Sequence, residues 1–285
     1  MRIRKLPLSA AVVAAMFAAP ALADQCDYSK DLGFDLDASG LSQLMLDVGA
    51  GKLEVSGQAG ADTVSVVATA CASSQKILDQ LELDQRRKGD TLVLETGEVK
   101  SSGWSLTGKS YHRIDLDIVV PASMALEIDD GSGSMVVTGV ASVVVDDGSG
   151  GMEIRDIGGD VTVDDGSGGI TIEGVAGSVR VDDGSGGMEI SGVEQSVYID
   201  EDGSGDIKIS DVIADVEIDE DGSGGIRVLD VGGNVLVADD SSGGIKVTNV
   251  SGDFMVERDS NGSIDYSNID GSVSIPRDKE RKRRM

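Results

Sequence analysis

Apolar and polar residues alternate along the second half of the chain in a pattern that returns every 17 to 19 residues. In one repeat, Ile170 and Ile172 flank a polar residue, Val175 follows, and Val179 and Val181 again flank a polar residue. The same five positions recur in the next four repeats as Met188, Ile190, Val193, Val197 and Ile199; Ile207, Ile209, Val212, Val216 and Ile218; Ile226, Val228, Val231, Val235 and Val237; and Ile245, Val247, Val250, Phe254 and Val256. A period of two places these side chains on one face of a strand, and most of them are β-branched, which favours strands. Each repeat therefore predicts two short strands joined by a bend at the middle valine.

A four-residue turn, Asp-Gly-Ser-Gly, separates the repeats. It begins at Asp130, Asp147, Asp165, Asp183, Asp202 and Asp221, and variant copies begin at Asp240 and Asp259. The dipeptide Asp-Gly is typical of tight turns, and the second glycine, such as Gly168 or Gly186, predicts a positive φ. A unit this short cannot bury its apolar face alone, so we expect equivalent positions to stack about 4.8 Å apart. The fold class that this predicts is all-β: a single-stranded β-solenoid (β-helix) with 17–19-residue coils over residues 123–275, about eight in number, in which Phe254 and Tyr266 close the last coils.

Residues 24–122 lack the turn motif but still contain short alternating runs. Strands are predicted over residues 44–46, 53–55, 64–67 and 114–120, a brief helix over 74–80, and a hairpin around 86–90. Residues 48–55 resemble a degenerate copy of one coil. We therefore expect a β-rich N-terminal capping region that starts the solenoid and covers its open end.

The two ends of the chain carry different signals. Residues 1–23 have a basic start, a short apolar run and an Ala-Leu-Ala cleavage site, which predicts a signal peptide and export to the periplasm or the cell surface. No later segment is long and apolar enough for a transmembrane helix. In an oxidising compartment, the two cysteines, Cys26 and Cys71, are most simply a disulfide. Residues 276–285 predict a basic disordered tail that is a solubilising end or a tether to anionic lipid.

The net charge of the chain limits the classes of partner that it is expected to bind. With 24 basic and 51 acidic residues, its net charge is −27. Such a surface repels nucleic acid and anionic lipid and attracts cations and basic partners. We therefore expect no nucleic-acid partner, and a protein or a glycan of the cell envelope instead.

Stacked turns would align two acidic columns. One contains the turn residues Asp130, Asp147, Asp165, Asp183, Asp202 and Asp221, and the other contains Asp129, Asp146, Asp164, Asp182, Glu201, Glu220 and Asp239. Carboxylates at this spacing repel one another, and bound Ca²⁺ would relieve the repulsion. This makes the first column a calcium-site candidate. The other interpretation is a solvated acidic edge that blocks sideways association, in which case no cofactor is needed.

The sequence gives little evidence of a catalytic site. The chain has one histidine, His112, outside the repeats, and its Ser and Asp residues recur in every turn without a unique constellation. We therefore expect no enzyme, with a polysaccharide-active enzyme as the most distant alternative. Trp104 and Tyr111 lie in a polar stretch, where they are candidates for contacting a glycan or a peptide, or for packing over the solenoid end.

The recurring Asp-Gly-Ser-Gly-Gly-Ile-x-Val of residues 165–172 and the Gly-x-Val-x-Val of residues 177–181 resemble a bacterial family of putative adhesins, a domain of unknown function with β-strand repeats. The resemblance covers most of the mature chain. It implies a role in the cell envelope, such as adhesion or stress sensing, and it carries no catalytic residues.

Overall fold

The structure is a computed structural model that describes residues 26–97, 99 and 110–277. The predicted signal peptide, Trp104 and residues 278–285 of the tail lie outside this part of the chain. The first half contains β1 (Tyr28–Asp31), β2 (Phe34–Asp37), β3 (Gln43–Gln58), β4 (Thr63–Ala72), α1 (Gln75–Leu78), β5 (Leu83–Lys88), β6 (Thr91–Thr96) and β7 (His112–Pro121). The rest consists of β8 (Ala125–Thr138), β9 (Ser142–Asp147), β10 (Gly150–Ile157), β11 (Val161–Asp165), β12 (Gly168–Val175), β13 (Val179–Asp183), β14 (Gly186–Val193), β15 (Val197–Asp202), β16 (Ile207–Val212), β17 (Val216–Asp221), β18 (Gly224–Val231), β19 (Val235–Asp240), β20 (Gly243–Val250), β21 (Phe254–Asp259), β22 (Gly262–Ile269) and β23 (Val273–Ser274).

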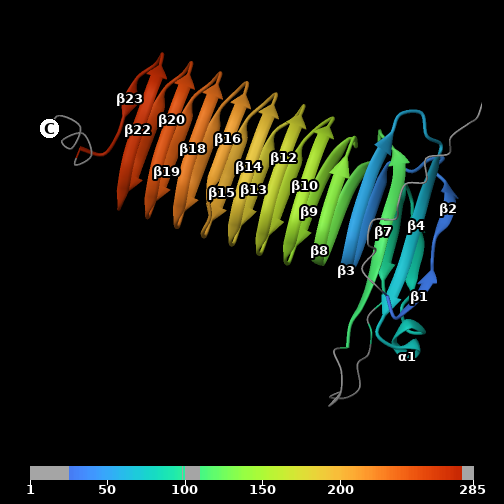
Figure 1. Ribbon diagram of the computed structural model, residues 1–285. Helices are drawn as coiled ribbons and strands as arrows, with labels where there is room; N and C mark the ends of the chain where they lie inside the picture. Colours follow the sequence, from blue (N-terminus) through green and yellow to red (C-terminus); the bar gives the residue numbers. More distant parts are fainter. Residues whose placement is uncertain (1–25, 98, 100–109, 278–285) are drawn as a thin grey trace, which may run out of the picture.

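The strands from β8 onward wind into a β-solenoid of about eight coils (Figure 1). Each strand pairs in parallel with the strand one coil away, so the even-numbered and odd-numbered strands form two ladders. The long strand β8 begins both ladders, because it pairs with β9 and with β10. In the even-numbered ladder, Ile172 lies opposite Ile190, which lies opposite Ile209, which lies opposite Val228. This continuous file confirms the predicted stacking of the repeats.

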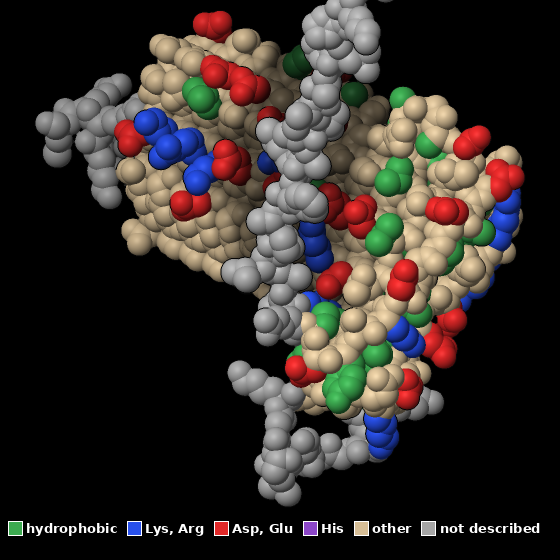
Figure 2. Space-filling model, turned by 45° about the vertical axis from the view of Figure 1, so that its right-hand side comes forward, with side chains coloured by type: hydrophobic (Ala, Val, Ile, Leu, Met, Phe, Trp, Pro, Cys, Tyr) green, Lys and Arg blue, Asp and Glu red, His purple; other side chains and the backbone are tan. Residues whose placement is uncertain are grey.

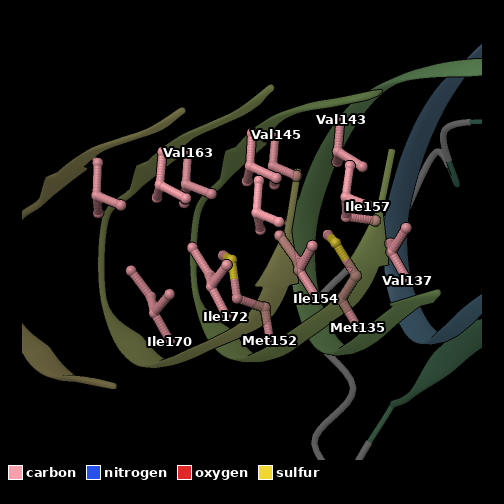
Figure 3. Close-up of a cluster of buried hydrophobic side chains, with 14 of the residues drawn as sticks. Met135, Val137, Val143, Val145, Met152, Ile154, Ile157, Val163, Ile170 and Ile172 are labelled. Atoms are coloured by element: carbon pink, nitrogen blue, oxygen red, sulfur yellow. The ribbon is translucent and has the colours of Figure 1, made fainter. Parts of the chain in front are cut away.

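The five predicted apolar positions of each coil fill the interior (Figure 3). All of those named from residue 170 to residue 256 are at most 3% exposed. Aliphatic side chains at the same height in successive coils therefore shelter one another from water, which is the main stabilising contribution. Phe254 is fully buried, and its ring centroid lies 5.8 Å from that of the half-buried Tyr266. The two aromatic residues close the last coils, as expected.

The bend in the even-numbered strands comes from one residue per coil with a left-handed backbone. Asp156, Asp211, Asp230, Asn249 and Asn268 have φ between 55° and 57°, and glycines occupy the equivalent places in other coils. Asn and Asp are the non-glycine residues that tolerate this conformation best. This residue has no partner in the strand register, so the chain turns here and the next valine points inward.

The N-terminal region continues the solenoid and then covers its end. The strand β3 pairs in parallel with β8, with Leu44 opposite Leu126 and Leu53 opposite Met135. On its other side β3 pairs with β6 and β7, and the antiparallel strands β4, β1 and β2 extend the sheet beyond β7 (Figure 1). The predicted helix is α1, where the Ser74 hydroxyl caps the N-terminus by accepting a hydrogen bond from the Ile77 amide. The predicted hairpin is β5–β6.

The predicted disulfide between Cys26 and Cys71 is present. It joins the start of the described chain to β4, in the part of the sheet that covers the solenoid. None of the described residues forms a helix that is long and apolar enough to cross a membrane.

Candidate functional site

The turn aspartates lie inside the solenoid, where they form a stack that we call the inner aspartate ladder. Asp130, Asp147, Asp165, Asp183, Asp202 and Asp221 are at most 3% exposed. Strand register explains their direction, because Val179, Val181 and Asp183 alternate along β13 and so share its inward face. The prediction of a solvated edge is therefore wrong for this column. The second column is exposed from Asp129 to Glu220 and half-buried at Asp239, so only this column lies where a solvated edge would.

Hydrogen bonds satisfy only part of the inner aspartate ladder. In the first four coils, the backbone amide two residues later donates to Oδ1; the Ser185 amide, for example, donates to Asp183 across 3.0 Å. The other oxygen, Oδ2, has no partner in Asp130, Asp165 and Asp183. In Asp202 and Asp221 neither carboxyl oxygen makes a well-formed hydrogen bond, although the Ser204 and Ser223 amides still act to lower their pKa values. A buried carboxyl without partners is costly when it is charged, so this arrangement favours the protonated form.

Burial raises the pKa values of the carboxyls in the inner aspartate ladder. It raises the pKa of Asp130, Asp165, Asp183 and Asp202 to about 6 each. For Asp221 burial raises the pKa to about 7, with a smaller contribution from the neighbouring carboxyls of Asp240 and Asp202. Near neutral pH the interior of the solenoid therefore holds a stack of carboxyls that are close to their point of protonation.

The structure offers the calcium interpretation only limited support. Among the described residues, no group of three or more His, Cys, Asp and Glu side chains is arranged to hold a metal ion. Ca²⁺ takes six to eight oxygen ligands, and successive ladder carboxyls stand one coil apart along a single line. The observation that still favours a cation is the lack of well-formed hydrogen bonds to the Asp202 and Asp221 oxygens.

Tyr111 lies beside the disulfide end of the chain. Its hydroxyl accepts a hydrogen bond from the Asp27 amide across 2.9 Å, and its amide donates to the Ser73 hydroxyl across 3.2 Å. Both contacts fix the N-terminal segment against β4, which accounts for Tyr111 without a ligand. Trp104, its predicted companion, lies outside the described residues.

His112, the one histidine, lines a hollow of about 470 Å³ between the first coil and the covering strands. Arg113, Asp47 and Asp129 also line this hollow, together with backbone of the Gly49 turn. Arg113 is paired with Asp115 across 3.0 Å. No hydrogen bond joins His112 to a serine or an aspartate among the described residues, so the geometry does not assemble a triad of the serine-hydrolase type.

A feature that the sequence reasoning missed is a short row of cations on the outer face of the even-numbered ladder. Lys208, Arg227 and Lys246 lie opposite one another on β16, β18 and β20, and all three side chains are exposed. We call this the basic row. Figure 2 shows a short row of Lys and Arg side chains on the solenoid with acidic side chains near its ends. Its signal in the sequence is a basic residue at the same repeat position three times in succession, at intervals of 19 residues.

Comparison with known proteins gives neighbours of low similarity. No family model and no curated protein matches the chain. Among solved structures, a "putative cell adhesion protein" from Clostridium sporogenes is 16% identical, with 71% of this chain and 99% of that chain covered and a TM-score of 0.38. A "putative adhesin" from Bacteroides fragilis is 13% identical, with 86% and 96% covered and a TM-score of 0.35. A "putative lipid binding protein" from Parabacteroides distasonis is 14% identical, with 88% and 98% covered and a TM-score of 0.39.

One of these neighbours is named, like the family that the repeat motif resembles, a putative adhesin. At such identities and TM-scores they carry no argument about what this chain binds.

Proposed function

We propose that the protein is an exported, non-enzymatic module of the cell envelope that binds its partner through the outer faces of the solenoid. The observation that supports this most directly is the strict register of the coils. Register places equivalent outward side chains in straight rows along a rigid surface, as in other repeat proteins that bind through extended faces. The interior, in contrast, is filled with aliphatic side chains and the inner aspartate ladder, and it leaves the outer faces as the place for recognition.

Export is supported by the disulfide and by the signal-peptide pattern of residues 1–23. Disulfides persist in oxidising compartments such as the periplasm and are rare in the cytosol. Periplasm and cell surface both satisfy this requirement. The acidic surface fits either place, because it keeps the protein away from nucleic acid and from anionic lipid.

The experiment that tests this function combines fractionation with binding. We expect the protein in the envelope or periplasmic fraction, with residues 1–23 removed. The labelled mature protein should bind isolated envelopes saturably, and excess unlabelled protein should displace it. Recovery of the uncleaved chain in the cytoplasm, or binding that does not saturate, would refute the proposal.

The calcium-binding version of the fold is the alternative that a specific observation favours, namely the poorly satisfied oxygens of Asp202 and Asp221. It requires that millimolar Ca²⁺ raise the melting temperature and that Asp202→Asn remove this effect. An unchanged melting temperature would leave the calcium-free version alone.

A further inference from the structure

We propose that the basic row binds a segment of an anionic polysaccharide that carries a carboxylate or sulfate on successive sugar units. This inference rests on the proposed binding function and names the class of its ligand. Lys208, Arg227 and Lys246 stand in register on three consecutive coils, so their positive charges recur at the coil spacing of about 4.8 Å.

The three cations of the basic row lack internal partners among the described residues. Elsewhere on the solenoid, Arg155 pairs with Glu153 and Glu173, Arg180 with Asp200, and Arg258 with Asp239. Within the described residues, no ion pair or hydrogen bond engages the side chains of the basic row. Like charges on neighbouring strands repel one another, and the protein has a large surplus of carboxylates that could have paired with them. Unpaired cations in this setting are available to an external anion.

Two neighbouring columns of mostly glycine residues lie beside the basic row. One column is required by the fold: a Cβ added to Gly186, Gly205 or Gly224 would lie 1.3 to 1.5 Å from a backbone oxygen of the preceding coil. The other column is not. Beside the basic row this column consists of Asp206, Gly225 and Gly244: a Cβ at Gly244 would come no closer than 3.6 Å to another atom, and one at Gly225 would lie 3.2 Å from Asp206 Oδ1. A side chain would fit at Gly244, yet Gly225 and Gly244 leave an open strip of backbone beside Arg227 and Lys246.

The open strip and the basic row together make a shallow binding surface. A hollow of about 110 Å³ is lined by Gly225, Gly244 and all three cations. Asp206 also lines it, but its Oδ1 accepts a hydrogen bond from the Gly225 amide across 3.0 Å. A sugar ring could therefore rest on the glycine backbone while its acidic group faces the cations.

The width of the basic row and its acidic flanks favour one class of anionic ligand over the others. The basic row is one residue wide, and in register it ends at Glu189 on one side and Asp265 on the other. A membrane would bring a plane of negative charge against these acidic flanks. An extended acidic peptide repeats its same-face side chains about every 6.6 Å, which is out of step with the coils. A single chain of acidic sugars matches the one-residue width of the row and does not press against its acidic flanks.

The test measures binding of oligogalacturonate and of dextran sulfate to the mature protein by calorimetry at low salt. The row variant is Lys208→Gln/Arg227→Gln/Lys246→Gln. Its matched control is Lys30→Gln/Lys76→Gln/Lys88→Gln, which removes the same charge from the N-terminal region. We expect at least tenfold weaker binding by the row variant and unchanged binding by the control. Asp206→Asn should strengthen binding, because it removes a negative charge beside the ligand. Affinity should fall as salt is added.

Equal affinity of the row variant and the control would overturn the inference, as would binding of methyl-esterified oligogalacturonate as tight as that of the free acid. Preferential binding of polyglutamate or of phosphatidylserine vesicles would assign the row to a peptide or to a membrane instead. If the wild-type protein binds neither acidic polysaccharide but still binds envelopes saturably, this inference fails and the proposed function stands. If it binds neither these polysaccharides nor envelopes, both this inference and the proposed function fail.

Discussion

At the scale of single residues, the two glycine columns show how one residue type serves two purposes. Gly186 has φ of +154° and packs against the Gly168 carbonyl of the preceding coil, so the fold itself demands glycine there. Gly187, the next residue, has no such contact. Sequence alone separates the two columns, because the second glycine of the turn is glycine in every copy from Gly133 to Gly262, whereas the next position also accepts Ser134, Asp206 and Ser263.

We predict that Gly186→Ala destabilises the protein by roughly 3 kcal/mol or more, because the new Cβ would lie 1.5 Å from the Gly168 oxygen and the backbone would have to shift. The matched control is Gly187→Ala, which should leave stability unchanged or raise it by up to about 1 kcal/mol. Denaturant titration measures both. Equal losses for the two variants would mean that the coils do not approach one another as described.

The burial of Asp183 could have been predicted from its place in the strand. Val179, Val181 and Asp183 are two residues apart, and a strand sends such positions to the same face. The usual rule that a charged residue lies at the surface points the other way, and it led to the wrong prediction for the turn column. The cost of burial is reduced because the carboxyl can be protonated, which depends on its surroundings in the folded protein.

At the scale of elements, the inner aspartate ladder gives stability an unusual pH dependence. Folding raises the pKa of these carboxyls above the ordinary value of 3.8, to about 6 for Asp202 and about 7 for Asp221. A raised pKa means that the folded state binds the proton more tightly than the unfolded state does. The resulting stabilisation is fully present below about pH 4, is lost as the pH rises through 6 to 7, and stays lost above.

We predict that the melting temperature rises when the pH is lowered from 8 to 5. Asp202→Asn should raise the melting temperature at pH 8 by several degrees, corresponding to roughly 1–3 kcal/mol, because it removes the charge of a buried carboxyl that is poorly satisfied by hydrogen bonds. The same variant should gain less from acid than the wild type. Glu201→Gln, one residue earlier on the exposed column, is the control and should behave like the wild type. A melting temperature that falls steadily from pH 8 to pH 5 would contradict this account.

The bend in each coil was predicted only in outline. The repeat indicated a loose turn near the middle valine, whereas the structure places one left-handed residue directly before it in most coils, as at Asp230 and Asn249. The signal was present, since only Gly, Asp and Asn occupy this position in the coils with positive φ. The side chains also stack: the Asn249 amide donates to Asp230 across 2.6 Å, and the Asn268 amide donates to Asn249 across 2.9 Å.

At the scale of the whole molecule, periodicity made the architecture predictable and the N-terminal region less so. Eight similar turns at nearly constant spacing left one way to bury the apolar faces, and the structure follows it. The strands over residues 26–97 have no such repetition, so their partners could not be paired from the sequence. In the structure, β4 is an antiparallel partner of three strands, and together they form a sheet at the end of the solenoid. The disulfide between Cys26 and Cys71 cross-links this sheet.

The same periodicity creates the outward rows on which the proposed function depends. The side chains at position 208 and at the equivalent positions of neighbouring coils lie on the outer face, so they can differ without affecting the interior. A solenoid can therefore change its recognition surface row by row while its core stays intact. The three cations of the basic row are the clearest instance on this chain.

The register of the coils is the claim on which the core, the aspartate ladder and the basic row all depend, and distances between spin labels measure it directly. Both native cysteines are in the disulfide, so introduced cysteines would be the free thiols. Labels at Glu153 paired with Arg227, Lys246 or Asp265 span four, five and six coils along one outward row. The account predicts narrow distance distributions that lengthen by about 4.8 Å from each pair to the next. Broad distributions, or distances that do not increase in equal steps, would contradict it.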